Sequence, residues 1–130
     1  MSVDVITLTL PPERDFHRVA HLVLGGLAVR LNLTLEALED LQLALDGLLD
    51  SGSREDEVTL SLTVLADAIE ASVGPFRHHT VRRELEGDGD GIGLRRVLDT
   101  VVDRVELSER DGSDWVQVTK RIDVQEAGAT

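Results

Sequence analysis

Apolar residues alternate strictly with Ser and Thr between residues 58 and 64, in the segment VTLSLTV. A repeat of two residues places all the apolar side chains on one side of an extended chain, so this segment predicts a β-strand with one buried face. One strand cannot bury that face alone. The rest of the chain must therefore supply further strands and a second layer that packs on them.

Other segments supply both parts. Strands are expected at residues 3–10, 58–64, 68–73, 105–107 and 115–122, the last two as a hairpin. Helical spacing of apolar residues predicts helices at residues 13–30, 34–50 and 94–102, with Thr34 as an N-cap. Residues 74–90 show no periodicity and are expected to form a polar loop. The order β-α-α-β-β-loop-α-β-β predicts an α/β fold, namely a two-layer α+β sandwich with helices on one face of a mixed sheet.

The chain has 130 residues, about the length of one domain, and 42% of them are hydrophobic. We expect a single domain over residues 1–125 and a frayed tail over residues 126–130. Two Phe, one Trp and no Tyr are the only aromatic residues. The core must therefore be built from aliphatic side chains.

Charge and composition exclude several classes of function. Acidic residues outnumber Lys and Arg by 25 to 13, so a nucleic-acid partner is not expected. The absence of Cys excludes disulfides and thiolate chemistry. No signal peptide and no apolar run of about 20 residues is present, so no membrane span is expected and the chain is predicted to be cytoplasmic. A protein partner would present a basic or apolar surface.

The segment Gly91-Ile92-Gly93-Leu94 stands where the polar loop becomes a helix. Glycines allow a ligand to approach the backbone closely, and the free N–H groups of a helix N-terminus favour an anion. A phosphate could bind near Gly93 and Leu94. On this fragment alone, a glycine-rich loop that merely enters a helix remains the better interpretation.

The wider pattern strengthens the phosphate interpretation. The run Gly91-x-Gly93-Leu94-x-x-Val97, followed by Val101-Val102, comes after a Leu-rich helix, a strand and a polar loop. In that position it resembles the second glycine box of the GHKL ATPase superfamily (the histidine kinase-like ATPase domain), and in particular the anti-sigma-factor serine kinases. The resemblance covers nearly the whole chain. It implies ATP and Mg²⁺ as cofactors, a sigma factor or anti-anti-sigma protein as partner, and a homodimer.

The same resemblance assigns roles on the helix at residues 34–50. The family has a Glu that acts as general base and, four residues later, an Asn that binds magnesium. By register these positions fall on Asp46 and Asp50. Residues four apart share a helix face, so both side chains could reach one pocket. Asp46 is one methylene shorter than Glu, and Asp50 adds negative charge beside a triphosphate.

The chain departs further from the first glycine box of the family, which has the pattern Asp-x-Gly-x-Gly. Ser72 stands in place of the Asp that accepts the adenine amine, Gly74 matches the first glycine, and the second glycine is missing. Three of the four family positions that carry the chemistry have therefore changed, namely those at Asp46, Asp50 and Ser72, while Gly91 and Gly93 remain. The resemblance thus implies a partly eroded nucleotide site in which ATP and Mg²⁺ binding is weak or lost.

Two groups of basic side chains offer other sites. His17 and His21 have a spacing that can bind a metal, but without a third ligand a solvent-facing pair is favoured. The cluster Arg77, His78, His79, Arg82 and Arg83 could contact a phosphate, but a solvated loop is favoured.

Three hypotheses of function remain open. The leading one is a regulatory domain that binds a sigma factor or antagonist protein in a partner-switching circuit. The alternative is an active ATP-dependent serine kinase of the same fold that phosphorylates an anti-anti-sigma factor. A third is a relative in fold alone, whose pocket binds another small molecule.

Overall fold

The computed structural model describes residues 4–51, 56–86 and 93–122. Its elements, in chain order, are β1 (Asp4–Leu10), the 3-10 turn η1 (Arg14–Phe16), α1 (His17–Leu31), α2 (Leu35–Asp50), β2 (Val58–Val64), β3 (Ala68–Phe76), α3 (Thr80–Glu86), α4 (Leu94–Val101), β4 (Arg104–Arg110) and β5 (Ser113–Arg121). The predicted strand at residues 58–64 and the predicted N-cap are both confirmed, since the backbone N–H of Ala37 donates to the hydroxyl of Thr34 over 3.1 Å.

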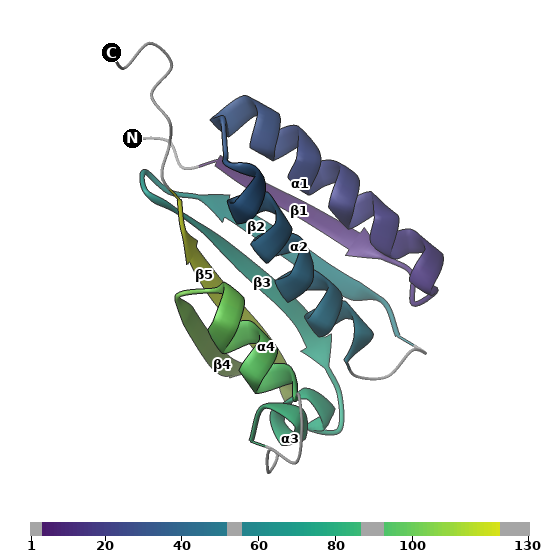
Figure 1. Cartoon of the computed structure of the whole chain (residues 1–130). Helices are drawn as coiled ribbons and strands as arrows, with labels where there is room; N and C mark the ends of the chain where they lie inside the picture. Colours follow the sequence, from purple (N-terminus) through teal and green to yellow (C-terminus); the bar gives the residue numbers. More distant parts are fainter. Residues whose placement is uncertain (1–3, 52–55, 87–92, 123–130) are drawn as a thin grey trace, which may run out of the picture.

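The strands form one five-stranded sheet in the order β1-β2-β3-β5-β4, and the helices cover one of its faces (Figure 1). The predicted two-layer α+β sandwich is confirmed. The sheet is antiparallel throughout, whereas a mixed sheet was expected. Two tight hairpins, β2–β3 and β4–β5, reverse the chain directly. The β4–β5 turn has positive φ at both Asp111 and Gly112, as a two-residue hairpin loop of type I′ requires.

Side-chain alternation along the strands separates the two faces of the sheet. Leu60 and Leu62 of β2 are buried, and across the ladder they lie opposite Val73 and Ala71 of β3, which are also buried. The opposite face of the sheet carries Ser, Thr and Gln side chains and is covered by no helix (Figure 1). The buried face packs against the aliphatic stripe of α2, whose buried members include Leu41, Leu45 and Leu48. The predicted aliphatic core is therefore confirmed.

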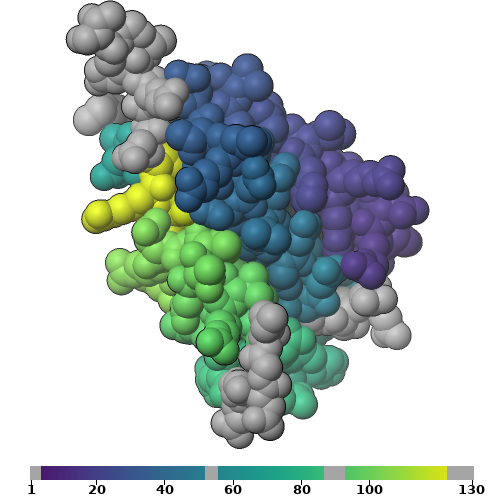
Figure 2. Space-filling model, viewed as in Figure 1, coloured from purple at the N-terminus to yellow at the C-terminus, as the bar shows by residue number. Residues whose placement is uncertain are grey.

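The helix layer forms the surface seen in Figure 2, with α2 between α1 on one side and α4 on the other. The longest of these helices, α2, has 16 residues. Within the described ranges, no helix is both long enough and apolar enough to cross a membrane.

The segment expected to be a polar loop contains regular structure. Strand β3 continues to Phe76, and α3 occupies Thr80–Glu86. Val81 and Leu85, one helical turn apart, are both buried and hold α3 against the rest of the molecule. The prediction was wrong here because two apolar residues are too few to produce a visible period among charged neighbours.

Two glycine-to-alanine substitutions should change stability in opposite directions. A Cβ on Gly74 would fall on the indole of Trp115, whereas a Cβ on Gly26 of α1 would have nothing within 4 Å. We expect Gly26→Ala to raise the free energy of unfolding by about 1 kcal/mol through helix propensity. Gly74→Ala should lower it by roughly 1–3 kcal/mol through overpacking. Urea unfolding of the two variants measures both, and a shift of the midpoint in the same direction would contradict this packing.

Candidate functional site

The two carboxylates predicted to serve the nucleotide lie on one face of α2, and that face meets α1. Nε2 of His21 lies 2.6 Å from Oδ1 of Asp46. Oδ1 of Asp50 lies 3.4 Å from Nε of Arg14 and 3.7 Å from Nδ1 of His17. Both aspartates keep about two-fifths of their side-chain surface exposed, at 42% and 41%. Each carboxylate is therefore already engaged by basic groups of the N-terminal part of the chain.

These contacts correct the interpretation of the two histidines. A solvent-facing pair was predicted, but the side chain of His17 is only 17% exposed and both rings point toward aspartates of α2. Among the described residues, no three His, Asp or Glu side chains gather into a group that could hold a metal ion. The pair thus joins α1 to α2.

Ser72 and Gly74 lie on the other side of the sheet. In the ladder, Ser72 stands between Ser61 of β2 and Gln117 of β5, within the polar row on the face that no helix covers. Gly74 is the residue over which Trp115 packs. Neither residue is brought together with Asp46 or Asp50, because the sheet itself separates them.

The glycine-rich segment is described only from Gly93 onward, since Gly91 lies outside the described residues. Gly93 is the N-cap of α4 and provides no capping side chain, as expected of a glycine. Leu94 is directed at α2, where its Cδ1 would lie 3.1 Å from a Cβ placed on Gly47. One turn later, the hydroxyl of Ser51 donates to the carbonyl of Gly47 over 2.8 Å. At this point of the junction between α2 and α4, a leucine packs on a glycine.

An open groove of about 400 Å³ runs along the outside of this junction. Its lining is largely apolar and comes from Leu43 of α2 and from Arg96, Val97, Thr100 and Val101 of α4. No carboxylate lines it. The groove could accept an apolar side chain of a partner, but it offers no carboxylate to a magnesium ion.

Among the described residues, the positions predicted to serve the nucleotide and the metal do not lie together. Asp46 and Asp50 face α1, while Ser72 and Gly74 face away from the helices. Only Gly93 and Leu94 occupy the helix N-terminus where a phosphate would be expected. Three parts of the predicted site thus lie in three different surroundings.

A buried ionic cluster that the sequence did not predict lies beside α3. Asp114, at the start of β5, is fully buried. Its Oδ1 accepts a hydrogen bond from Nη2 of Arg82 over 3.0 Å, and its Oδ2 lies 3.1 Å from Nδ1 of His79. Burial alone would raise the pKa of Asp114, but the hydrogen bonds and positive charges of these two partners outweigh it and hold that pKa below its usual range.

The cluster changes the interpretation of the basic segment at residues 77–83. Arg82 does not belong to a solvated loop, because it reaches a buried carboxylate on another strand. His78 and His79 both have positive φ, at 60° and 54°, which is uncommon for residues other than glycine. Sequence reasoning missed Asp114 because it directly follows the turn residues Asp111, Gly112 and Ser113 and looks like part of the turn. Asp114 stands two residues before Val116 and four before Val118, and this repeat of two, which places all three on the buried face of β5, was the signal that could have identified it.

Asp114→Asn should weaken the attachment of α3 and remove part of the acid sensitivity of the fold. The folded-state pKa lies below the unfolded value of about 3.9, so the carboxylate stabilises the fold fully above about pH 4 and loses this effect as the pH falls through the folded pKa. We expect Asp114→Asn to lower the free energy of unfolding by about 2 kcal/mol near pH 7. Urea unfolding between pH 7 and pH 2 measures both effects.

The matched control is Asp99→Asn, which alters an exposed ion pair with Arg95 within α4. It should change the free energy of unfolding by less than about 0.5 kcal/mol. If both variants lost equal free energy of unfolding, or if the pH dependence of stability in Asp114→Asn matched that of the unaltered chain, the buried cluster would not stabilise the fold in this way.

Comparison with known proteins finds relatives that align with most of the chain. No protein-family profile matches the chain. A protein of Bacillus velezensis named serine-protein kinase RsbW is 27% identical over an alignment of 135 positions, gaps included, which covers 85% of this chain and 82% of the relative. Proteins of the same name are 28% identical in Listeria monocytogenes, covering 92% and 88%, and 26% identical in Bacillus subtilis, covering 85% and 82%. The chain is thus similar to serine-protein kinases over most of its length.

Proposed function

We propose that this chain is a regulatory protein-binding domain of the anti-sigma-factor type, which acts in a partner-switching circuit by holding a sigma factor or its antagonist. Similarity to proteins named serine-protein kinase RsbW over most of both chains supports the family. The GHKL type of fold is part of the same proposal. The net charge of −12 supports a protein partner with a basic or apolar contact surface.

The observation that carries the proposal is the packing of Leu94 on Gly47 at the junction of α2 and α4. A phosphotransfer enzyme needs a base and magnesium ligands beside the phosphates. At this junction α2 presents Gly47, and Leu94 packs upon it. The two nearby carboxylates are held by His21 and by Arg14 with His17. A domain with these features can retain the fold for binding a protein while it no longer transfers phosphate.

An active serine kinase of the same fold is the second candidate. It is favoured by the name of the relatives and by the partial exposure of Asp46, which is 42% exposed and could still accept a proton. In that case Asp46 would serve as base, Asp50 would bind Mg²⁺, and Gly91 and Gly93 would lie at the phosphates. The side chains of both aspartates would have to leave their present partners, which are His21 for Asp46 and Arg14 with His17 for Asp50.

Isothermal titration with ATP, in the presence and absence of Mg²⁺, separates the two candidates. We expect no magnesium-dependent binding at millimolar ATP, because Asp50 is engaged by Arg14 and His17. Micromolar, magnesium-dependent affinity that Asp50→Ala weakens by roughly tenfold or more would favour the kinase. Asp99→Ala, which removes an exposed carboxylate of α4, is the control and should leave any affinity unchanged.

The partner can be tested directly with the sigma factors of the source organism, each co-expressed with this chain. We expect one of them to form a stable complex without added ATP, detected by size-exclusion chromatography with light scattering. If no complex forms with any of them, or with their antagonist proteins, the proposed regulatory role is rejected.

A further inference from the structure

The groove between α2 and α4 has the size of a small-molecule site. Its volume of about 400 Å³ lies within the range of about 300–1,000 Å³ that such sites occupy. It begins one helical turn beyond the contact of Leu94 with Gly47. Leu43 lies one turn before that glycine on α2, and Val97 lies one turn after that leucine on α4. The two helices lie side by side on the surface shown in Figure 2, so the groove opens to solvent on the helix face of the molecule.

The lining of the groove presents apolar side chains to solvent. Leu43 is 53% exposed, although Leu45 of the same helix is fully buried in the core. Val97 is partly exposed on α4, and Val101 adds a largely buried apolar side chain to the lining. Contact between apolar surface and water is unfavourable, so a ligand gains free energy when it covers such a surface. The lining therefore favours a ligand with an apolar part.

One positive charge without a partner lies beside this apolar surface. Of the residues that line the groove, only Arg96 carries a charge. Its guanidinium makes no ion pair or hydrogen bond with the described residues, whereas Nε of the adjacent Arg95 pairs with Oδ2 of Asp99 over 3.2 Å. The hydroxyl of Thr100 donates to the backbone carbonyl of Arg96 over 2.7 Å, so that proton is already used. The guanidinium of Arg96 is thus available to an anion.

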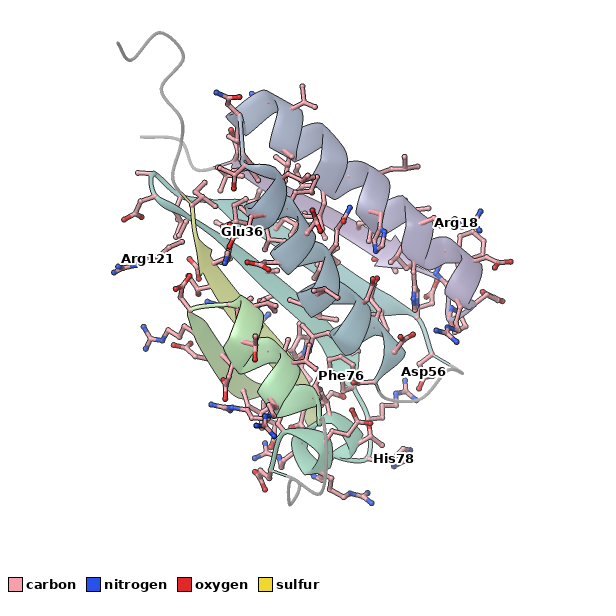
Figure 3. The ribbon with its side chains drawn as sticks, in the orientation of Figure 1. Arg18, Glu36, Asp56, Phe76, His78 and Arg121 are labelled. Carbon is pink, nitrogen blue, oxygen red and sulfur yellow. The ribbon has the colours of Figure 1, made fainter. Side chains whose placement is uncertain are left out.

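The acidic residues of α2 lie outside the lining of the groove. Glu36, near the start of the helix (Figure 3), lines a separate polar pocket together with Asp40 and Lys120, and these last two form an ion pair over 2.9 Å. Asp46 contacts His21 on the flank that meets α1. Among the described residues, no carboxylate therefore lines the groove to repel an anion, although the whole chain has a net charge of −12.

We propose that this groove binds a small aliphatic carboxylate of the medium-chain fatty acid class. The hydrocarbon chain covers Leu43, Val97 and Val101, and the carboxylate pairs with the guanidinium of Arg96. The ligand site is separate from the proposed protein-binding function, and either can exist without the other.

Other classes of occupant fit this lining poorly. Arg96 would repel a cation, and one guanidinium without any nearby magnesium ligand does not neutralise a triphosphate. A protein partner typically contacts about 20–30 residues on each side of an interface, which is far more than the five that line this groove. An apolar chain with one anionic group matches both the size and the charge of the groove.

The test uses octanoate as the probe, with octanol as a neutral analogue and octylammonium as a cationic one. Titration of the ¹⁵N-labelled full chain, followed in ¹H–¹⁵N spectra, gives each dissociation constant and identifies the amides that respond. We expect octanoate to cause saturable shifts at Leu43, Arg96 and Val97 and to bind at least about tenfold more tightly than octylammonium. The negative net charge alone would favour the cation, so a preference for the anion reports on Arg96.

The length of the hydrocarbon chain tests the apolar part of the site. Each methylene that the groove buries should tighten binding by about threefold. Decanoate should therefore bind about tenfold more tightly than octanoate, and hexanoate about tenfold more weakly. An affinity that does not change with chain length would mean that the apolar lining makes no contact with the ligand.

Two pairs of matched variants test the residues. Arg96→Gln should weaken octanoate binding by about tenfold and leave octanol binding unchanged, whereas Arg95→Gln, beside the groove, should change neither. Leu43→Asp should abolish octanoate binding because it places a carboxylate in the apolar lining, whereas Leu22→Asp, at an exposed leucine of α1, should leave it unchanged. Melting temperatures show which variants are folded, and the two arginine variants decide the matter if Leu43→Asp unfolds.

Four results would overturn the proposal: no saturable shift at millimolar octanoate, equal affinity for octanoate and octylammonium, equal effects of Arg96→Gln and Arg95→Gln, or a dimer that Leu43→Asp dissociates. The last result would show that a second copy of the chain covers the groove. Each can be told apart from failure of the proposed function, because complexes with sigma factors and ATP binding are measured without octanoate.

Discussion

The packing of α2 on the inner face of the sheet determines where every candidate functional group lies. The stripe formed by Leu41, Leu45 and Leu48 is fully buried against aliphatic side chains of the strands. With so few aromatic residues in the chain, these leucines supply much of the buried area. Once this stripe faces the sheet, the rotation of α2 about its axis is fixed, and so is the direction of each remaining side chain.

The rotation of α2 explains why its acidic and small residues have different neighbours. Asp46 and Asp50 lie on the flank that meets α1, where they contact His21, His17 and Arg14. Gly47 lies on the flank that meets α4, where Leu94 packs on it. Neighbouring positions on a helix lie about 100° apart around its axis, so Asp46 and Gly47 meet different elements. The chemistry available at the junction of α2 and α4 therefore depends on a small residue, and the carboxylates next to it in sequence serve to join two helices.

Much of the fold could be predicted because its strands and long helices have strong periodicity. Residues 58–64 were predicted to the residue, and Thr34 was identified as a cap because its hydroxyl can satisfy a free N–H group. The short helix α3 was missed because its two buried residues form no repeat. The direction of the sheet strands was missed because pattern alone gives the order of elements and not their pairing.

The site was harder to predict than the fold. Periodicity placed Asp46 and Asp50 on one helix face but could not show which neighbour that face meets. Ser72 could be assigned to a strand, yet its side of the sheet depends on the register with β2 and β5. The contacts of Asp114 with Arg82 and His79 join residues more than 30 positions apart, which no local pattern reveals.

An NMR titration of the ¹⁵N-labelled chain with magnesium and ATP tests the central claim most directly, because it reports on the two flanks of α2 separately. The account predicts that the amides of Gly47 and Leu94 keep their positions and that the contact between His21 and Asp46 persists. Saturable shifts at Gly47 and Leu94, together with loss of the contact between His21 and Asp46, would contradict it.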